Sequence, residues 1–111
     1  MLLEGNHAQV ESTANMLIKI KYLGPLALML NKREEELEVS SSASIDDLLR
    51  KLSSLYGEEF ENEVLQDGGE NVRTGTAVTV NGKVIGQLDG MGTRLKMGDT
   101  IALLPLFLGG G

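Results

Sequence analysis

The chain has 111 residues and a formal net charge of −6 at pH 7, because 16 acidic residues outnumber 10 Lys and Arg. This length suits one domain, and the acidic balance argues against nucleic acid or an anionic membrane as a partner. The sequence has no cysteine, which excludes disulfides, thiolate metal sites and cysteine nucleophiles. Since His7 is the only histidine, a Ser-His-Asp site is nearly excluded as well.

The first segment, residues 1–15, has neither a basic start nor a long apolar run, so it does not resemble a secretory signal. It contains Glu4 and Glu11 but no Lys or Arg. We expect a mobile extension outside the fold, either an upstream start or an added sequence, with a docking arm as the alternative. Since no targeting signal is visible, we expect a cytoplasmic protein.

A hairpin is the first predicted element. Residues 16–23 alternate between apolar and polar side chains, which is the period of a half-buried strand. Residues 24–25 (Gly-Pro) break this pattern, and a compact apolar stretch follows at 26–30. Alternation returns at 37–40 and predicts a second strand paired with the first. The three glutamates at 34–36 are interpreted as a solvated loop or a strand edge.

One long amphipathic helix is predicted to start after Ser44, which would be its N-cap, with Asp47 completing a capping box. Apolar residues at helical spacing form one broad stripe: Ile45, Leu48, Leu49, Leu52, Leu55 and Tyr56. Gly57 stands where a glycine with positive φ commonly ends a helix. We expect the stripe to pack against the sheet.

An acidic stretch, residues 58–70, follows without a basic residue. Phe60 and Val64, four residues apart, predict a short helical turn within it. The carboxylates could hold a cation, but their spacing lacks the ladder of a calcium loop. A solvated acidic face is therefore the preferred interpretation, and no metal site is predicted.

Strand character returns at Thr76, and Asn81-Gly82 between apolar runs predicts a tight hairpin. Residues 86–98 are expected to form a loop before a last strand at 100–106. Three apolar residues of this loop are expected to contact the core: Leu88, Met91 and Leu95. The order of two strands, a helix and two more strands predicts an α+β roll, in which one main helix packs across a mixed sheet of four or five strands.

No catalytic site is predicted. Gly82-Lys83 resembles the end of a P-loop, but Val84 stands where that motif requires a hydroxyl. Asp46 and Asp47 are adjacent on the predicted helix and point apart, so they form a poor acid/base couple.

The carboxyl end carries the strongest functional signal. After Pro105 the sequence continues through apolar residues into three glycines, which lack Cβ atoms and could extend into a narrow tunnel of a partner enzyme. Four apolar residues suit a hydrophobic contact with such a partner, although they could equally pack on their own sheet: Leu104, Leu106, Phe107 and Leu108. A frayed terminus without a role is the alternative for the whole segment 107–111.

This order of elements with this ending resembles the ubiquitin-like β-grasp sulfur carriers, particularly the small subunit of molybdopterin synthase. It resembles still more the related small archaeal modifier proteins. The resemblance rests on the opening strand, the helix from Ser44, residues 78–85, residues 95–105 and the closing glycines. It implies a β-grasp domain over 16–106, followed by a functional tail.

The resemblance also implies a carrier rather than an enzyme. A ubiquitin-activating-type enzyme would use ATP to adenylate the carboxylate of Gly111, with Gly110 in the same narrow channel and Gly109 as support. The adenylate would accept sulfur as a thiocarboxylate, for molybdopterin synthesis or tRNA thiolation, or pass to a lysine of a target protein. The expected partners are the activating enzyme, target-protein lysines and the large subunit of molybdopterin synthase. The free protein is expected to be a monomer without a bound cofactor.

Three hypotheses remain open at this point. The chain is a sulfur carrier, or a modifier that forms isopeptide bonds through Gly111, or a β-grasp binding module in which the glycines are incidental. The position of Gly111 at the end of the sequence favours the first two, because both need a slim tail with a free carboxylate. Three cations close to the tail in sequence would meet an acidic partner or simply be solvated: Lys83, Arg94 and Lys96.

Overall fold

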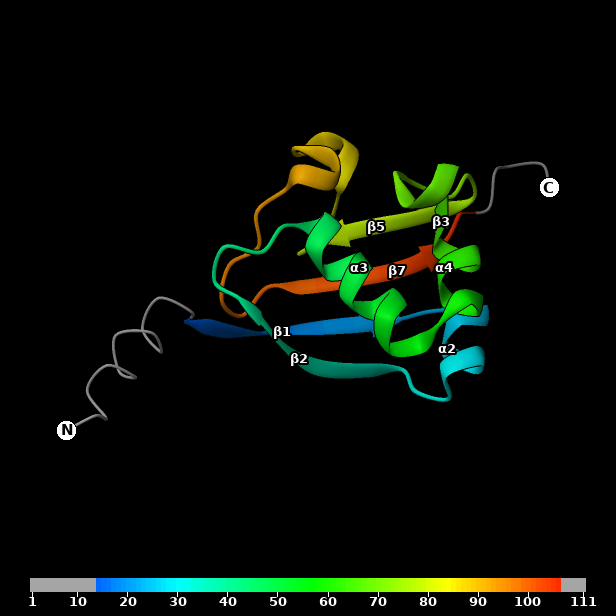
Figure 1. Cartoon of the computed structure of the whole chain (residues 1–111), viewed down its shortest axis with the longest axis horizontal. Helices are drawn as coiled ribbons and strands as arrows, with labels where there is room; N and C mark the ends of the chain where they lie inside the picture. Colours follow the sequence, from blue (N-terminus) through cyan, green and yellow to red (C-terminus); the bar gives the residue numbers. More distant parts are fainter. Residues whose placement is uncertain (1–13, 107–111) are drawn as a thin grey trace.

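The computed structural model describes residues 14–106 as one five-stranded sheet with α3 packed across one face (Figure 1). The strand order is β2-β1-β7-β5-β6. These strands are β1 (Asn15–Tyr22), β2 (Glu34–Ser40), β5 (Thr76–Val80), β6 (Lys83–Val84) and β7 (Thr100–Pro105). The helices are α2 (Pro25–Leu30), α3 (Ile45–Tyr56) and α4 (Glu58–Val64). The predicted α+β roll with a mixed sheet is confirmed.

Shorter elements complete the chain. A separate two-stranded sheet consists of β3 (Leu65–Gln66) and β4 (Asn71–Val72), joined by the 3₁₀ turn η1 (Asp67–Gly69). Two further 3₁₀ turns, η2 (Ile85–Gln87) and η3 (Gly90–Gly92), lie between β6 and β7. No helix within residues 14–106 is long and apolar enough to cross a membrane.

The predicted hairpin of β1 and β2 is confirmed, with Met16 opposite Val39 in an antiparallel pair. It begins at Asn15, one residue earlier than predicted. β2 lies at the edge of the sheet, so the glutamates at 34–36 occupy an edge strand, where charge discourages pairing with another sheet.

The compact apolar stretch after β1 is the short helix α2, which the sequence did not reveal. Pro25 occupies its first turn, and Asn31 ends it with a left-handed φ of 57°. Six residues are too few for a helical period to show in a sequence. Leu26 is buried, whereas Leu28 is 85% exposed.

The predicted capping box of α3 is confirmed. The Ser44 hydroxyl accepts a hydrogen bond from the Asp47 backbone N–H at 3.3 Å, and the Asp47 carboxylate accepts one from the Ser44 N–H at 2.9 Å. Four residues of the predicted stripe are fully buried: Ile45, Leu48, Leu49 and Leu52. Leu55 is 54% exposed, so the buried stripe is narrower than predicted, because this residue lies at its margin.

The acidic stretch contains the predicted helical turn, which is α4. Phe60 and Val64 are fully buried on its inner side, and the Phe60 ring lies 6.1 Å from that of Tyr56 at the end of α3. Its glutamates face outward or lie at the boundary. No group of three or more Asp, Glu or His among the described residues could hold a metal ion.

The tight turn between β5 and β6 has the predicted geometry, with φ of 51° at Asn81 and 88° at Gly82. In the loop that follows, Leu95 is buried and Met91 packs partly against the core, as expected. The prediction for Leu88 is wrong, because this side chain is 37% exposed and borders a surface groove.

Candidate functional site: the carboxyl end of strand β7

Strand β7 leads into the carboxyl-terminal segment and lies at the centre of the sheet. It pairs in parallel with β1 and antiparallel with β5. Ile101 and Leu103 are fully buried beneath α3. Both edges of β7 are therefore hydrogen-bonded and its core-facing side is packed, which makes it a rigid support for whatever follows.

The last described contacts lie at the end of β7. The Leu23 N–H donates to the Leu103 carbonyl at 3.0 Å, and the Leu106 N–H donates to the Gly75 carbonyl at 2.8 Å. The carboxyl end of β7 points toward the side of the molecule that carries α2 and α4 (Figure 1). The backbone is thus held in place as far as Leu106.

Gly24 allows the turn after β1 to pass against Pro105. Its φ is 64°, and a Cβ atom at this position would lie 2.9 Å from the Pro105 Cγ, closer than real contacts allow. Glycine is therefore required here both for backbone conformation and for space. In the sequence, residues 24–25 indicate only a break, because nothing local reveals that Pro105 packs against Gly24.

We expect Gly24→Ala to lower the free energy of unfolding by about 2 kcal/mol, because it adds a clash to an unfavourable φ. Gly75→Ala is the matched control, since its φ is 96° but a Cβ there would meet nothing within 4 Å. The control should lose only about 1 kcal/mol. Urea unfolding measures both, and equal losses would show that the contact with Pro105 contributes nothing.

Several apolar side chains lie around the end of β7. Leu23, Pro25, Leu104 and Pro105 line a small depression of about 50 Å³. Leu104 is half-buried, so it packs partly on its own sheet, whereas Leu23 and Leu106 are 44% and 47% exposed. We call these five residues the exit surface.

The remaining tail residues predicted to act, Phe107, Leu108, Gly109, Gly110 and Gly111, lie outside the described residues. Their roles stay predictions. Leu23 and Pro25 are additions that sequence analysis missed, because their proximity to Leu104 arises from the parallel pairing of β1 with β7.

A polar cluster begins at Tyr22, the residue before Leu23 of the exit surface. The hydroxyls of Tyr22 and Tyr56 each donate to the Glu35 Oε2 at 2.6 Å. The Lys32 Nζ donates to the Glu35 Oε1 at 3.2 Å and to the Tyr56 hydroxyl at 2.9 Å. One carboxylate thereby joins β1, β2, the end of α3 and the turn after α2.

The cluster shifts three pKa values. Burial, followed by the hydrogen bond to Glu35, raises the pKa of Tyr22 well above its usual range. Burial alone would raise the pKa of Glu35, but hydrogen bonds from Tyr22, Tyr56 and Lys32 outweigh it and the pKa lies below its ordinary value. Hydrogen bonds to Tyr56 and then Glu35 raise the pKa of Lys32.

Lys83, Arg94 and Lys96 do not lie near the exit surface, although they are close to the tail in sequence. They surround a groove beside the start of β7, whereas the exit surface lies at the other end of this strand (Figure 1). β7 runs from one end of the sheet to the other. Residues beside its start therefore lie far from residues at its end, although the two sets are close in sequence.

Among the described residues that line the depression, Glu63 is the only titratable one. A single carboxylate without a paired acid, base or nucleophile offers no catalytic arrangement. The geometry instead provides a rigid strand and an apolar surface, which suit the presentation of the following segment to another protein.

Comparison with known proteins decides the family. The model of the ThiS family matches residues 20–110, which is most of the chain. The chain belongs to the ThiS family. The match runs from the last residues of β1 through α3 and β7 into the glycine run as far as Gly110.

Relatives of this ThiS-family chain are small modifier proteins. Small archaeal modifier protein 3 of Haloferax volcanii is 26% identical over 95 residues, which cover 86% of this chain and 100% of the relative. The crystal structure of SAMP1 from Haloferax volcanii is 26% identical and superposes with a TM-score of 0.71, covering 85% of this chain and 99% of that one.

A second structure supports the fold alone. It is the putative molybdopterin converting factor, subunit 1, from Pyrococcus furiosus, with 24% identity, a TM-score of 0.68 and coverage of 83% of this chain and 99% of that one. Together these comparisons confirm the β-grasp fold and the resemblance to small archaeal modifiers. The chain is a ubiquitin-like member of a modifier and sulfur-carrier family, and its relatives are not enzymes.

Proposed function

We propose that this ThiS-family chain is a carrier and modifier that is activated at the carboxylate of Gly111. The observation that carries the proposal is the extent of the family match, which continues through β7 into the glycine run. Gly109 and Gly110 lie within the matched residues, which supports a role for the tail. The exit surface supports the same conclusion, because Leu106, the last described residue, is nearly half exposed and available to a partner.

The chemistry starts from a weak electrophile. A carboxylate does not react with amines or sulfide at neutral pH, so a partner enzyme must first supply a leaving group. A carboxylate oxygen of Gly111 attacks the α-phosphorus of ATP, an acyl-adenylate forms, and pyrophosphate leaves. ATP is thus a substrate of the activating enzyme, and this chain needs no bound cofactor.

Two routes lead from the acyl-adenylate. A sulfide equivalent attacks the acyl carbon, displaces AMP and leaves a thiocarboxylate on Gly111. Alternatively the amine of a target lysine attacks the same carbon, loses a proton and forms an isopeptide bond with release of AMP. The absence of cysteine fits both routes, because no thiol of this chain competes for the activated carbonyl.

The partners follow from these steps. The chain requires an adenylating enzyme of the ubiquitin-activating type, and then either a sulfur-accepting partner, such as the large subunit of molybdopterin synthase, or proteins with accessible lysines. The relationship to a protein named as a modifier supports the lysine route, and the fold shared with a molybdopterin converting factor is compatible with the sulfur route.

Exchange of labelled pyrophosphate into ATP tests the first step. The full chain should stimulate exchange by an adenylating enzyme from the same cells, and a variant that lacks Gly110 and Gly111 should not. A known carrier of that enzyme serves as the positive control. If the full chain gives no exchange while the control carrier does, the activation proposal is wrong and a β-grasp binding module becomes the better account.

A further inference from the structure

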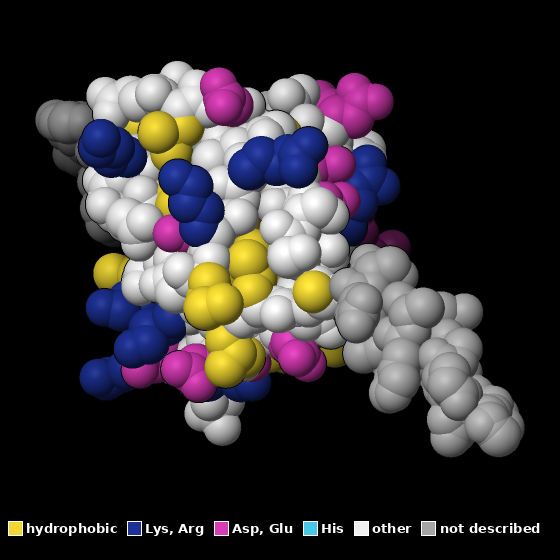
Figure 2. All heavy atoms as spheres, turned by 90° about the vertical axis from the view of Figure 1, so that its left-hand side faces the viewer, with side chains coloured by type: hydrophobic (Ala, Val, Ile, Leu, Met, Phe, Trp, Pro, Cys, Tyr) yellow, Lys and Arg dark blue, Asp and Glu magenta, His cyan; other side chains and the backbone are white. Residues whose placement is uncertain are grey.

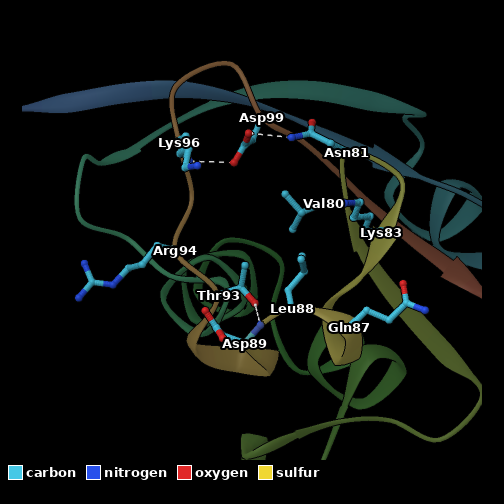
Figure 3. Close-up of a pocket in the computed structure, with 10 residues that line it drawn as sticks. All are labelled: Val80, Asn81, Lys83, Gln87, Leu88, Asp89, Thr93, Arg94, Lys96 and Asp99. Carbon is cyan, nitrogen blue, oxygen red and sulfur yellow. Dashed lines mark hydrogen bonds between the residues drawn. The ribbon is translucent and has the colours of Figure 1, made fainter.

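A groove of about 630 Å³ lies at the end of the sheet opposite the exit surface. The turn between β5 and β6 forms one side, and the loop between η2 and β7 forms the other (Figure 3). This groove is far larger than the depression beside β7, which measures about 50 Å³. Neither the family match nor the proposed activation of the tail assigns it a role.

The rims of the groove carry three cations. Lys83 lies on one side, and Arg94 and Lys96 lie on the other (Figure 3). Within residues 14–106 the ammonium groups of Lys83 and Lys96 have no hydrogen-bond or ion-pair partner, and Arg94 makes only a long bond of 3.4 Å to the Ser42 carbonyl. The end of the molecule that faces the viewer in Figure 2 accordingly shows several Lys and Arg side chains across its upper half.

The carboxylates of the groove do not neutralise these cations fully. Asp99 is 9% exposed, and its two oxygens accept hydrogen bonds from the Asn81 side chain at 2.9 Å and the Lys96 N–H at 2.8 Å. Asp89 is exposed, so water screens its charge. Three cations thus face two carboxylates, one of them buried, on a chain whose net charge is −6.

The floor of the groove is apolar. Val80 and Leu88 point toward each other in its centre (Figure 3), and Leu88 is 37% exposed. Leu88 can therefore contact and bury one apolar side chain of a ligand. The cations on the rims can at the same time bind acidic groups of that ligand. This arrangement matches a peptide segment better than a free anion.

Hydrogen bonds hold the walls of the groove in shape. Asn81 accepts from the Thr100 N–H at 2.9 Å while its amide donates to Asp99. On the opposite side the Thr93 hydroxyl donates to the Gly90 carbonyl at 2.7 Å and accepts from the Asp89 N–H at 3.0 Å. A preformed groove loses less conformational entropy when it binds a ligand.

We propose that this groove binds an acidic segment of a partner protein, in which one apolar residue is flanked by aspartates or glutamates. Charge complementarity points to an acidic segment. The rest of this acidic chain would repel such a segment, whereas the exposed cations around the apolar floor of the groove would attract it. The site lies at the opposite end of β7 from the exit surface, so the chain can hold such a partner while its tail is engaged elsewhere. The proposal does not depend on activation of Gly111.

A titration followed by NMR tests the proposal. The probe is a short peptide with one central leucine flanked by aspartates and glutamates, added to the ¹⁵N-labelled full chain. We expect saturable shifts at the backbone amides of Lys83, Leu88 and Lys96. The triple variant K83Q/R94Q/K96Q should bind about 10-fold more weakly, as expected for the loss of three partly exposed charge contacts.

Three controls make the test specific. The variant K19Q/K21Q/K51Q removes the same charge from β1 and α3 and should bind the peptide as the natural chain does. A chain without Gly110 and Gly111 should also bind normally, which separates this site from the proposed activation. A peptide with serine in place of leucine should bind more weakly, because it leaves the floor uncovered.

Two kinds of result would overturn the proposal. Equal weakening by the two triple variants, or unsaturable shifts spread over the sheet, would show only general charge attraction and overturn the proposal. If inorganic phosphate produced the same shifts with the same affinity, the groove would bind simple anions and not an acidic segment. Preserved dispersion of the amide spectrum shows that each variant is folded.

Discussion

Replacement of Gly110 with valine is expected to slow adenylate formation about 100-fold or more, while the domain remains as stable as before. Activation requires the tail to enter a channel and to place the Gly111 carboxylate against the α-phosphorus of ATP. A branched side chain next to that carboxylate widens the tail and displaces the reacting atom. Pyrophosphate exchange measures the rate, and thermal unfolding monitors the fold.

The matched control is Gly86→Val. A Cβ atom at Gly86 would meet nothing within 4 Å, and this residue does not have a positive φ. It lies in η2, away from the exit surface, so the same substitution should leave exchange unchanged. If Gly110→Val were activated at the natural rate, a slim tail would not be a requirement and the proposed role of the glycines would fail.

Removal of the Glu35 carboxylate is expected to have the second large effect. We expect Glu35→Ala to lower the free energy of unfolding by about 3 kcal/mol at pH 7, because it leaves the hydroxyls of Tyr22 and Tyr56 and the Lys32 ammonium without their shared acceptor. Urea unfolding measures the change. Glu36→Ala is the control, since this exposed neighbour on β2 makes no such bonds, and it should change stability by less than about 0.5 kcal/mol.

The pH dependence of stability provides a second readout of the same cluster. Because the pKa of Glu35 is lowered in the folded chain from its ordinary 4.5, its contribution is present above that value and is lost as the pH falls through the folded pKa. The raised pKa of Tyr22 affects the stability of the folded chain in the alkaline range. Its proton is retained in the folded chain, so stability falls above pH 10.0, the ordinary value at which the unfolded tyrosine ionises.

Glu35→Gln should therefore flatten the acid limb of the stability profile while the Glu36→Gln control retains it. An unchanged acid limb in Glu35→Gln would show that Glu35 does not carry the pH dependence. The cluster would then contribute to packing rather than to proton-linked stability.

Local features were predictable because they depend on residues close in sequence. The capping box of Ser44 and Asp47, the turn at Asn81-Gly82 and the buried stripe of α3 each follow from spacing of at most a few residues. The mixed sheet of four or five strands followed less directly, from the number of strands and the single long helix, and the order of the strands within it was not predicted. These elements sufficed to predict an α+β roll, and the β-grasp fold followed from the resemblance to the sulfur carriers and small archaeal modifiers.

Features that join distant segments were not predictable. The contact of Gly24 with Pro105 connects positions eighty-one residues apart (105 − 24), and neither residue signals the other. α2 was missed because a six-residue helix shows no period, and Leu88 was misplaced because an apolar loop residue can border a groove as well as a core. The three cations Lys83, Arg94 and Lys96 are close to the tail only in sequence, and the fold gathers them around a groove at the other end of β7 from the exit surface.

The measurement that tests the central claim most directly is mass spectrometry of the chain after incubation with ATP, the activating enzyme and a sulfide donor. The account predicts an intact mass that corresponds to replacement of one oxygen by sulfur, and fragmentation that assigns the sulfur to Gly111. With a lysine-bearing target in place of sulfide, the same experiment should link Gly111 to a lysine amine. An unchanged mass under conditions that convert a control carrier, or a modification assigned to any residue other than Gly111, would contradict the account.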